Sequence, residues 1–391
     1  MDDIYEKTSL TPLRVARTSG YIDWESQPSK FKQYPEFLFR YELNSNIALK
    51  VVELSRKITS VSHISAKPYY RLNTPSAGNL HPIELYVQIR GVKGVLSGVY
   101  HVDSATDSLV LIAEIENDGI EHMLGIDNIF KGMIFLISCV PFRSYWKYGD
   151  RAFRYCYLDA GHQIGAIQAS LTIDNNNATI LSVNEADKLN LFMGFKDEEF
   201  VCSAVGVGYE GDKNVQELKE KLIHVSPTDY SQNSESIYKI FLNQDTKYTL
   251  LPIPCSIDEG IIKNRRSARK FSAGKIDKNI DKTIKNILNN PPEGLVCEVI
   301  DLKDDATKDK ICDLLIGQSF VKNSLSAIVI TSEYFNSSML MTAGAFAHQL
   351  HLYIQSQNLG FSGIGAFYDK KLQKYIRTQN YILYVCVIGT I

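Results

Sequence analysis

Two segments of this 391-residue chain read as copies of one strand–helix–strand unit, and this repetition limits the fold more than any other feature. Residues 159–171 (DAGHQIGAIQASL) and 342–354 (TAGAFAHQLHLYI) share an Ala-Gly pair. Both place apolar residues at i, i+4, i+7 and i+11, the spacing of a buried helix face. An apolar strand precedes each helix, at 133–140 in the first copy and at 326–332 in the second. A strand that ends in glycine follows each helix, at 205–208 and at 387–389.

The repetition predicts an α+β fold of two similar halves. The first half is expected at 1–210 and the second at 259–391, joined by a polar connection at 211–258 that is rich in Lys, Asn, Gln and Ser. Two copies of one unit are expected to pack as the subunits of a dimer do, about a pseudo-two-fold axis. The alternative is a pair of unrelated α+β segments that share ordinary strand–helix–strand logic.

Other periodic segments fit the α+β prediction. An apolar stripe predicts a helix from Ile47 to Ile58, and alternation predicts a strand at 83–89 and a hairpin at 98–112. These elements are not βαβ units with a GxGxxG loop, and no GxxxxGK[ST] motif occurs, so a Rossmann or P-loop fold is poorly supported.

Charge and cysteine usage restrict the class of protein. The formal net charge of −2 predicts no nucleic-acid partner and no attraction to an acidic membrane. The N-terminal segment lacks the pattern of a signal peptide, and the apolar runs are too short to span a bilayer. Seven scattered cysteines without a CxxC pair indicate reduced thiols. We therefore expect a cytoplasmic protein.

The loop RLNTPSAGNLHP (71–82) is the first candidate binding segment. Pro75 fixes its own φ, Ser76 offers a hydroxyl, and Ala77-Gly78 have little bulk, so backbone N–H groups could lie flat against a planar ligand. The alternative is a plain turn between a helix and a strand.

Two further candidates lie in the second half. NRRSARKFS (264–272) supplies three guanidinium groups and a hydroxyl, which suits a phosphate, although a solvated basic helix start is the alternative. GFSGIGAFYD (360–369) has three glycines, which indicate either close backbone approach to a ligand or ordinary loop flexibility.

Taken together and in this order, the three segments resemble the FMN-dependent nitroreductase superfamily, especially its SagB-type branch of peptide-azoline dehydrogenases. Branch-specific segments also match at 21–35, 98–103 and 148–162. The resemblance implies a nitroreductase-like fold of two fused halves that binds FMN. It also implies that the FMN phosphate is held by Arg265, Arg266, Ser267 and Arg269. The isoalloxazine would be contacted by Pro75, Ser76, Ala77, Gly78 and Asn79. The amides near flavin N5 would come from Ile364, Gly365 and Ala366.

The resemblance also implies a single flavin site per chain. The phosphate motif is clear only in the second half and the Pro-Ser motif only in the first, so the halves together build one full site. A reciprocal site would depend on 13–19 (LRVARTS) and 289–294 (NNPPEG), both degenerate. Family members often hold the flavin with basic residues beyond the last strand, but only two residues follow Gly389 here. Either Arg71 or Arg266 takes that role, or binding is weak.

Lys147-Tyr148 is the catalytic candidate, because a Lys-Tyr pair beside the flavin is important in the azoline-dehydrogenase branch. Free Lys and Tyr have pKa values near 10, so either needs a lowered pKa to act as a base at neutral pH. Tyr148 is predicted as the base, with Lys147 tuning it or polarising the substrate. Nearby arginines would favour a tyrosinate or a neutral lysine: Arg143, Arg151 and Arg154. The alternative is an amphipathic pair in a loop.

A metal site is not predicted. His348 and His351 lie three apart on a helix face, but no HExxH motif, cysteine cluster or companion carboxylate occurs at zinc spacing. Packing in the interior or beside the flavin is the expected role of these histidines.

Three functions follow from these patterns. The first is an FMN-dependent oxidase or dehydrogenase of azoline rings, or of a similar C–N or C–C bond, in a modified peptide, with hydride transfer to flavin N5 and a cyclodehydratase as partner. The second is an NAD(P)H-dependent reductase of nitro compounds or quinones. The third is a flavin-less scaffold subunit of a peptide-modification complex. Further self-association of the pseudo-dimer is left open.

Overall fold

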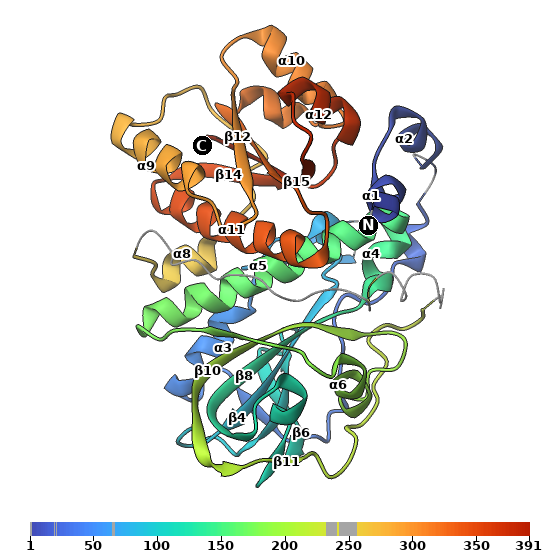
Figure 1. The fold of residues 1–391 in the computed structure, drawn as a ribbon, viewed down its shortest axis with the longest axis vertical. Coiled ribbons are helices and arrows are strands. Elements are labelled where there is room, and N and C mark those ends of the chain that lie inside the picture. Colours follow the sequence, from blue (N-terminus) through green and yellow to red (C-terminus); the bar gives the residue numbers. More distant parts are fainter. Residues whose placement is uncertain (1, 19, 21, 65–66, 232–240, 242–255) are drawn as a thin grey trace.

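The structure is a computed structural model that describes residues 2–18, 20, 22–64, 67–231, 241 and 256–391. Residues 232–240 and 242–255 of the predicted connection lie outside this part. Two sheets lie on opposite sides of a central pair of long helices, α5 (Ala152–Ile173) and α11 (Ser337–Ser356) (Figure 1). Nearly all of both helices is buried, as their apolar spacing predicts.

The first sheet has seven strands in the order β1-β6-β5-β4-β8-β10-β9, and the second has four in the order β12-β13-β15-β14. All neighbours in both sheets are antiparallel. Their bounds are β1 Arg40–Glu42, β4 Ile83–Arg90, β5 Gly98–Asp103, β6 Ser108–Glu114, β8 Asn128–Cys139, β9 Thr179–Leu181, β10 Phe200–Asn214, β12 Val296–Asp301, β13 Ser326–Ser332, β14 Leu359–Ile364 and β15 Tyr381–Thr390.

The sheets share a four-stranded core of the same topology. β4 pairs with β8, β8 with β10, and β10 with β9. In the second half β12, β13, β15 and β14 pair in the same sequence. The long helix leaves the second strand of each core and precedes the last two. The predicted α+β fold of two similar halves is confirmed, with β1, β5 and β6 as an extension of the first sheet.

The two central helices touch through their backbones at Gly161 and Gly344. A Cβ atom on Gly161 would lie 2.9 Å from the Cα atom of Gly344 and would collide with the carbonyl oxygen of Met341. A Cβ atom on Gly344 would lie 3.0 Å from the Cα atom of Gly161 and would collide with the carbonyl oxygen of Leu158. Each glycine therefore faces the carbonyl three residues before the other, which is the reciprocity of a two-fold axis.

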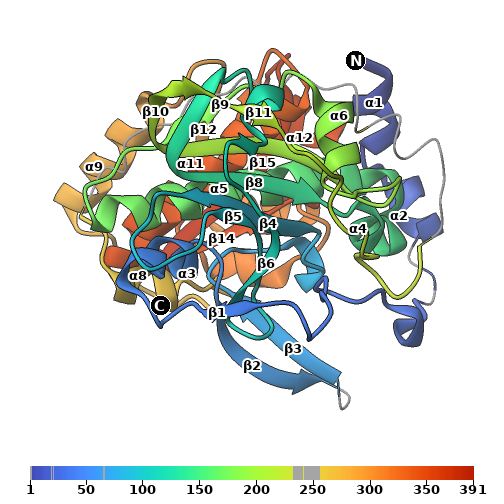
Figure 2. The ribbon, with the colours of Figure 1, turned by 90° about the horizontal axis from the view of Figure 1, so that it is seen from below.

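Smaller elements surround this frame. A two-stranded hairpin, β2 with β3, projects from the body beside the first sheet (Figure 2). The remaining bounds are α1 Asp2–Thr8, α2 Pro12–Thr18, α3 Lys50–Ser55, β2 Ile58–Ile64, β3 Lys67–Leu72, β7 Asp118–Gly119, α4 Pro141–Tyr148, α6 Ala186–Phe192, β11 Gln216–Glu217, α8 Glu259–Asn264, α9 Lys278–Asn289, α10 Asp305–Leu314 and α12 Asp369–Ile376.

Three local expectations differ from the structure. Ile58 does not continue the predicted helix, because α3 ends at Ser55 and Ile58 opens β2. Gly360 and Gly363 lie inside β14, where Tyr384 packs against Gly363, so only Gly365 of that segment is in the loop. β10 continues to Asn214, four residues into the predicted polar connection.

Two findings concern the class of protein. No helix among the described residues is long and apolar enough to cross a membrane. The six cysteines that the structure describes are all free thiols.

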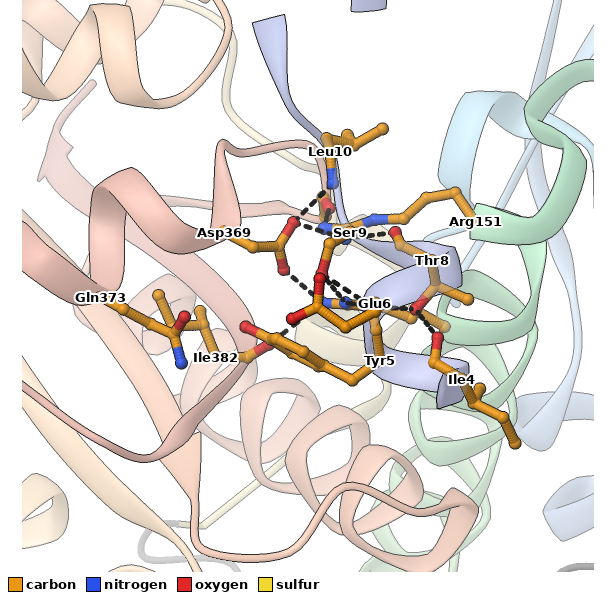
Figure 3. Close-up of polar contacts among 12 residues, drawn as sticks. Ile4, Tyr5, Glu6, Thr8, Ser9, Leu10, Arg151, Asp369, Gln373 and Ile382 are labelled. Atoms are coloured by element: carbon orange, nitrogen blue, oxygen red, sulfur yellow. Dashed lines mark hydrogen bonds and ion pairs between the residues drawn. The ribbon is translucent and has the colours of Figure 1, made fainter. Parts of the chain in front are cut away.

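The N-terminal segment crosses from the first half to the second through a buried ion cluster (Figure 3). Asp369, at the start of α12, accepts hydrogen bonds from Arg151 at 2.9 Å, Arg154 at 2.6 Å and the backbone N–H of Leu10 at 2.8 Å. Arg151 also donates to the carbonyl oxygen of Gly365 at 2.7 Å. The cluster thus fixes the loop after β14 against the start of α5.

Replacing Gly344 by Ala is expected to destabilise the protein by about 1–3 kcal/mol, because the added methyl group meets rigid backbone rather than a movable side chain. The loss should appear in the free energy of unfolding, measured by denaturant titration. Gly211→Ala is the matched control, since its Cβ atom would meet only ordinary contacts at 3.4 Å. Equal stability of Gly344→Ala and wild type would contradict the close helix contact.

Asp369→Asn is expected to cost about 3–5 kcal/mol of stability, because it removes the counter-charge of two buried arginines. Arg151 and Arg154 are at most 4% exposed, and Asp369 is fully buried. Asp281→Asn breaks an exposed pair with Lys285 and should cause no measurable change. A similar small effect of both substitutions on urea unfolding would show that the cluster adds little.

Candidate active site between the two halves

A cavity of about 370 Å³ lies between the halves. The first half supplies the loop before β4, the end of α4 and one face of α5, whereas the second half supplies β14, the loop after it and Ser267-x-Arg269. The lining residues that matter here are Pro75, Ser76, Ala77, Gly78, Tyr148, Tyr155, Leu158, Asp159, His162, Ser267, Arg269, His351, Phe361, Ile364, Gly365, Ala366 and Tyr384.

A second cavity of about 270 Å³ adjoins the first and shares Pro75, Ser76, Ser267 and Arg269 with it. Its wall also includes Arg71, Asn79, Arg265 and Arg266. Every residue predicted to hold a cofactor therefore lines one of these two cavities or both. Each volume is near the lower end of the range of small-molecule sites, about 300–1,000 Å³.

The loop before β4 is held in a fixed shape. Gly78 and Asn79 both have positive φ (63° and 60°), which is easy for glycine and tolerated by asparagine. The hydroxyl of Ser76 accepts a hydrogen bond from the backbone N–H of His81 at 3.0 Å. The His81 ring lies 3.0 Å from the Asn79 side-chain oxygen, and burial lowers the pKa of this histidine to about 3. Contacts within the loop therefore hold its shape.

Arg265 joins the second half to this loop. Its Nε donates to the carbonyl oxygen of Asn73 at 2.6 Å, and its Nη2 to that of Leu72 at 3.1 Å. The residue is only 4% exposed, so it is not part of a solvated basic helix start. The remaining Nη1 is buried and has no hydrogen-bond partner among the described residues. A buried cation with a free donor favours an anionic ligand.

The other basic residues surround the same cavity with less burial. The Arg266 guanidinium donates to its neighbour's carbonyl oxygen at 2.7 Å, and burial and Arg71 lower its pKa. Arg269 donates to Ser362 and lies over the Phe320 ring at 4.7 Å. No carboxylate in the described ranges forms an ion pair with Arg265, Arg266 or Arg269.

The structure brings Lys147 and Tyr148 to the loop before β4. A Cβ atom on Gly78 would lie 3.3 Å from Lys147 Nζ and would collide with the Tyr148 hydroxyl. The Tyr148 ring packs edge-on against Tyr155 with 4.7 Å between centroids. Lys147 Nζ lies over the Trp24 ring at 4.7 Å. The pair is on a helix, α4, and not in a loop.

The electrostatic argument for a tyrosinate at position 148 is wrong. Burial, followed by Tyr155 and Asp159, raises the pKa of Tyr148, so its phenol is neutral at physiological pH. The arginines that were expected to lower this pKa have other partners. Arg143 binds Glu84 at 2.7 Å, and the other two bind Asp369. Lys147 does have a lowered pKa, but burial is the cause.

Sequence reasoning missed Asp159 as a member of this site. The residue lies on the cavity-facing side of α5, one turn before His162, and is 7% exposed. Burial raises the pKa of its carboxyl group to about 7. A carboxylate within a helix whose apolar spacing predicts burial was the available signal, because such residues are seldom buried without a partner or a function.

His351 and Tyr384 also line the cavity, and neither was predicted as a ligand. The His351 ring lies 3.0 Å from the carbonyl oxygen of Arg266. The Tyr384 hydroxyl oxygen lies 3.2 Å from His162 Nε2. These groups form the polar wall of the cavity on the side of the second half.

Comparisons with known proteins give two informative similarities. No family model matches the chain. A protein of Methanocaldococcus jannaschii that carries the name of a nitroreductase is 30% identical over 139 residues, which cover 32% of this chain and 70% of that protein. A crystal structure from Anabaena variabilis, also named as a nitroreductase, covers 100% of this chain and 99% of its own, with a TM-score of 0.79 and 19% identity.

A partial similarity was also found, to an FMN-dependent nitroreductase of Clostridium difficile. It is 23% identical and covers 34% of this chain and 86% of its own, with a TM-score of 0.29. The full-length superposition confirms the predicted nitroreductase-like fold. The 30% identity to the Methanocaldococcus protein, of which the chain covers 70%, shows that the chain belongs to the nitroreductase family.

Proposed function

We propose that the protein is an FMN-dependent oxidoreductase that oxidises azoline rings in a modified peptide. One observation carries this proposal: the predicted flavin motifs of both halves line two joined cavities, and Lys147-Tyr148 lies against the same loop. A cyclodehydratase is the kind of enzyme that would supply such a ring.

The residues present fit FMN. The smaller cavity is bordered by Arg265, Arg266, Ser267 and Arg269, and the free Nη1 of Arg265 suits a phosphate oxygen. The larger cavity has apolar walls from Leu158, Phe361 and Ile364 beside the backbone of the Pro75 loop, which suits a flat ring. A relative in Clostridium difficile is named as FMN-dependent, which agrees with this choice.

Bound FMN would supply a hydride acceptor in this cavity. The chain's own residues would bind the substrate and handle its proton. Tyr148, as a neutral phenol, can donate a hydrogen bond to a ring heteroatom of the substrate. Lys147, whose pKa is lowered by burial, lies beside it against Gly78 of the loop before β4. The pair is thereby assigned to substrate binding and polarisation rather than to proton abstraction by a tyrosinate.

A single flavin per chain is part of the proposal. In the reciprocal position the segment at 13–19, whose last residue lies outside the described residues, would have to hold the phosphate. Arg14 of that segment instead donates to backbone carbonyls of Lys7 at 3.0 Å and Ser9 at 2.8 Å. Its guanidinium is therefore occupied in closing the turn between α1 and α2.

The second candidate is an NAD(P)H-dependent reductase of nitro compounds or quinones, favoured by the names of the two relatives. Both candidates need FMN and differ in the electron donor. A scaffold without flavin is disfavoured, because Arg265 is buried with a free Nη1 and has no carboxylate partner among the described residues, an arrangement that suits a bound anion.

The visible absorption spectrum of the purified protein, before and after reconstitution with FMN, tests the proposal. A flavin-to-protein ratio near one is expected, with bleaching by a thiazoline or oxazoline peptide under nitrogen and little bleaching by NADPH. Rapid bleaching by NADPH would favour the reductase hypothesis. A protein that takes up no FMN would favour the scaffold hypothesis. A ratio near two would refute the single site.

Lys147→Ala and Tyr148→Phe are expected to lower turnover by about 100-fold or more, since each removes a polar group at the reacting centre, while FMN stays bound. The chain offers a matched control in Lys374-Tyr375, a second Lys-Tyr pair on α12. Lys374→Ala and Tyr375→Phe should keep full activity. Unchanged turnover in either variant of the first pair would remove that residue from the mechanism.

A further inference from the structure

Asp159 is a buried carboxyl group directed into the larger cavity. It lies on α5 between the Pro75 loop of the first half and β15 of the second, and the lining groups near it include Tyr148, His162 and Tyr384. Its Oδ2 atom has no hydrogen-bond partner among the residues that the structure describes. A buried polar atom of this kind needs a partner, and the cavity is where a ligand could provide one.

Burial and three neighbouring groups determine the pKa of Asp159. Burial is the largest effect and raises the pKa of the carboxyl group to about 7. The Ser76 hydroxyl, the Ala77 backbone and the Arg56 guanidinium act in the opposite direction. On the facing elements, Tyr148 and Tyr384 have pKa values raised chiefly by burial, and the charge of Asp159 raises them further.

The other titratable groups of this wall keep one charge state near neutral pH. Burial, followed by Arg265, lowers the pKa of His162 to about 3, and burial and Arg265 also lower that of His351. The tyrosines stay protonated because their pKa values are raised. Among the described groups that line the cavity, Asp159 is therefore the one suited to exchange a proton near pH 7.

We propose that Asp159 is the base that takes the proton from the substrate. This inference rests on the proposed azoline oxidation. In that reaction the ring C4–H bond breaks and its proton goes to the Asp159 carboxylate. The electron pair left behind forms the C4=C5 bond and a hydride departs from C5, so the ring is oxidised by two electrons to an azole. Bound FMN would supply the acceptor for this hydride, and the carboxyl group later releases its proton to water.

The first test needs no cofactor. A protein with an acid whose pKa is raised on folding loses stability as pH rises from the unfolded pKa to the folded pKa, because unfolding then releases the proton that the native state still holds. The melting temperature of Asp159→Asn minus that of wild type should therefore grow from pH 5 to pH 7 and level off above it. Asp174→Asn, which replaces an exposed aspartate where α5 ends, is the matched control. A constant difference for Asp159→Asn would overturn the proposal.

The second test follows flavin bleaching by an azoline peptide in single turnovers under nitrogen. In wild type the rate should rise with pH through about 7, as the carboxylate forms. Asp159→Asn should bleach about 100-fold or more slowly with unchanged FMN affinity, and Asp159→Glu should recover part of the rate. A wild-type rate and pH profile in Asp159→Asn would overturn the role of Asp159 alone. A wild-type protein that binds FMN but is not bleached would overturn the azoline oxidation and this proposal with it.

A further variant keeps the proposal falsifiable if Asp159→Asn does not fold. Ser76→Ala removes a hydroxyl that lowers the pKa of Asp159. The rising limb of the bleaching rate should then move to higher pH. An unmoved limb would contradict the assignment of that limb to Asp159.

Discussion

The backbone contact between α5 and α11 is the constraint on which the rest of the structure depends. Because Gly161 and Gly344 carry no side chains, the helices approach until each glycine meets the other helix's backbone. This contact sets the distance between the two sheets. The loop before β4 and the loop after β14 then line the same cavity, so the candidate site is built from residues of both halves.

The halves are alike in topology but differ in the segments that they send across the interface. The second half sends Arg265 to the carbonyl oxygens at 72 and 73, with one donor left free. The first half sends its N-terminal segment to Asp369, where the arginines are neutralised. The contact made by Arg265 therefore leaves a buried positive charge beside a cavity. The contact at Asp369 instead forms a buried ion cluster in which the charges are paired. This difference explains why one complete site is expected from two similar halves.

The repeat and the α+β fold of two similar halves could be predicted from the sequence because they depend on local spacing. The candidate cofactor loops were singled out by their small and basic residues, and their roles came from the resemblance to a family. Ionisation could not be predicted from the sequence. The pKa of Tyr148 depends on burial under distant elements, and the arginines beside it in sequence bind Glu84 and Asp369 instead. Asp159 was hidden for the same reason. Only the folded cavity shows that its carboxyl group faces the site with an Oδ2 atom that has no hydrogen-bond partner among the described residues.

The central claim is that one ligand site is shared between the two halves. A crystal structure of the FMN-reconstituted protein tests this claim most directly. The account predicts density for one flavin, with its phosphate near Arg265 and its ring between the Pro75 loop and Gly365. A flavin bound by residues of one half alone, or at another place on the surface, would contradict it.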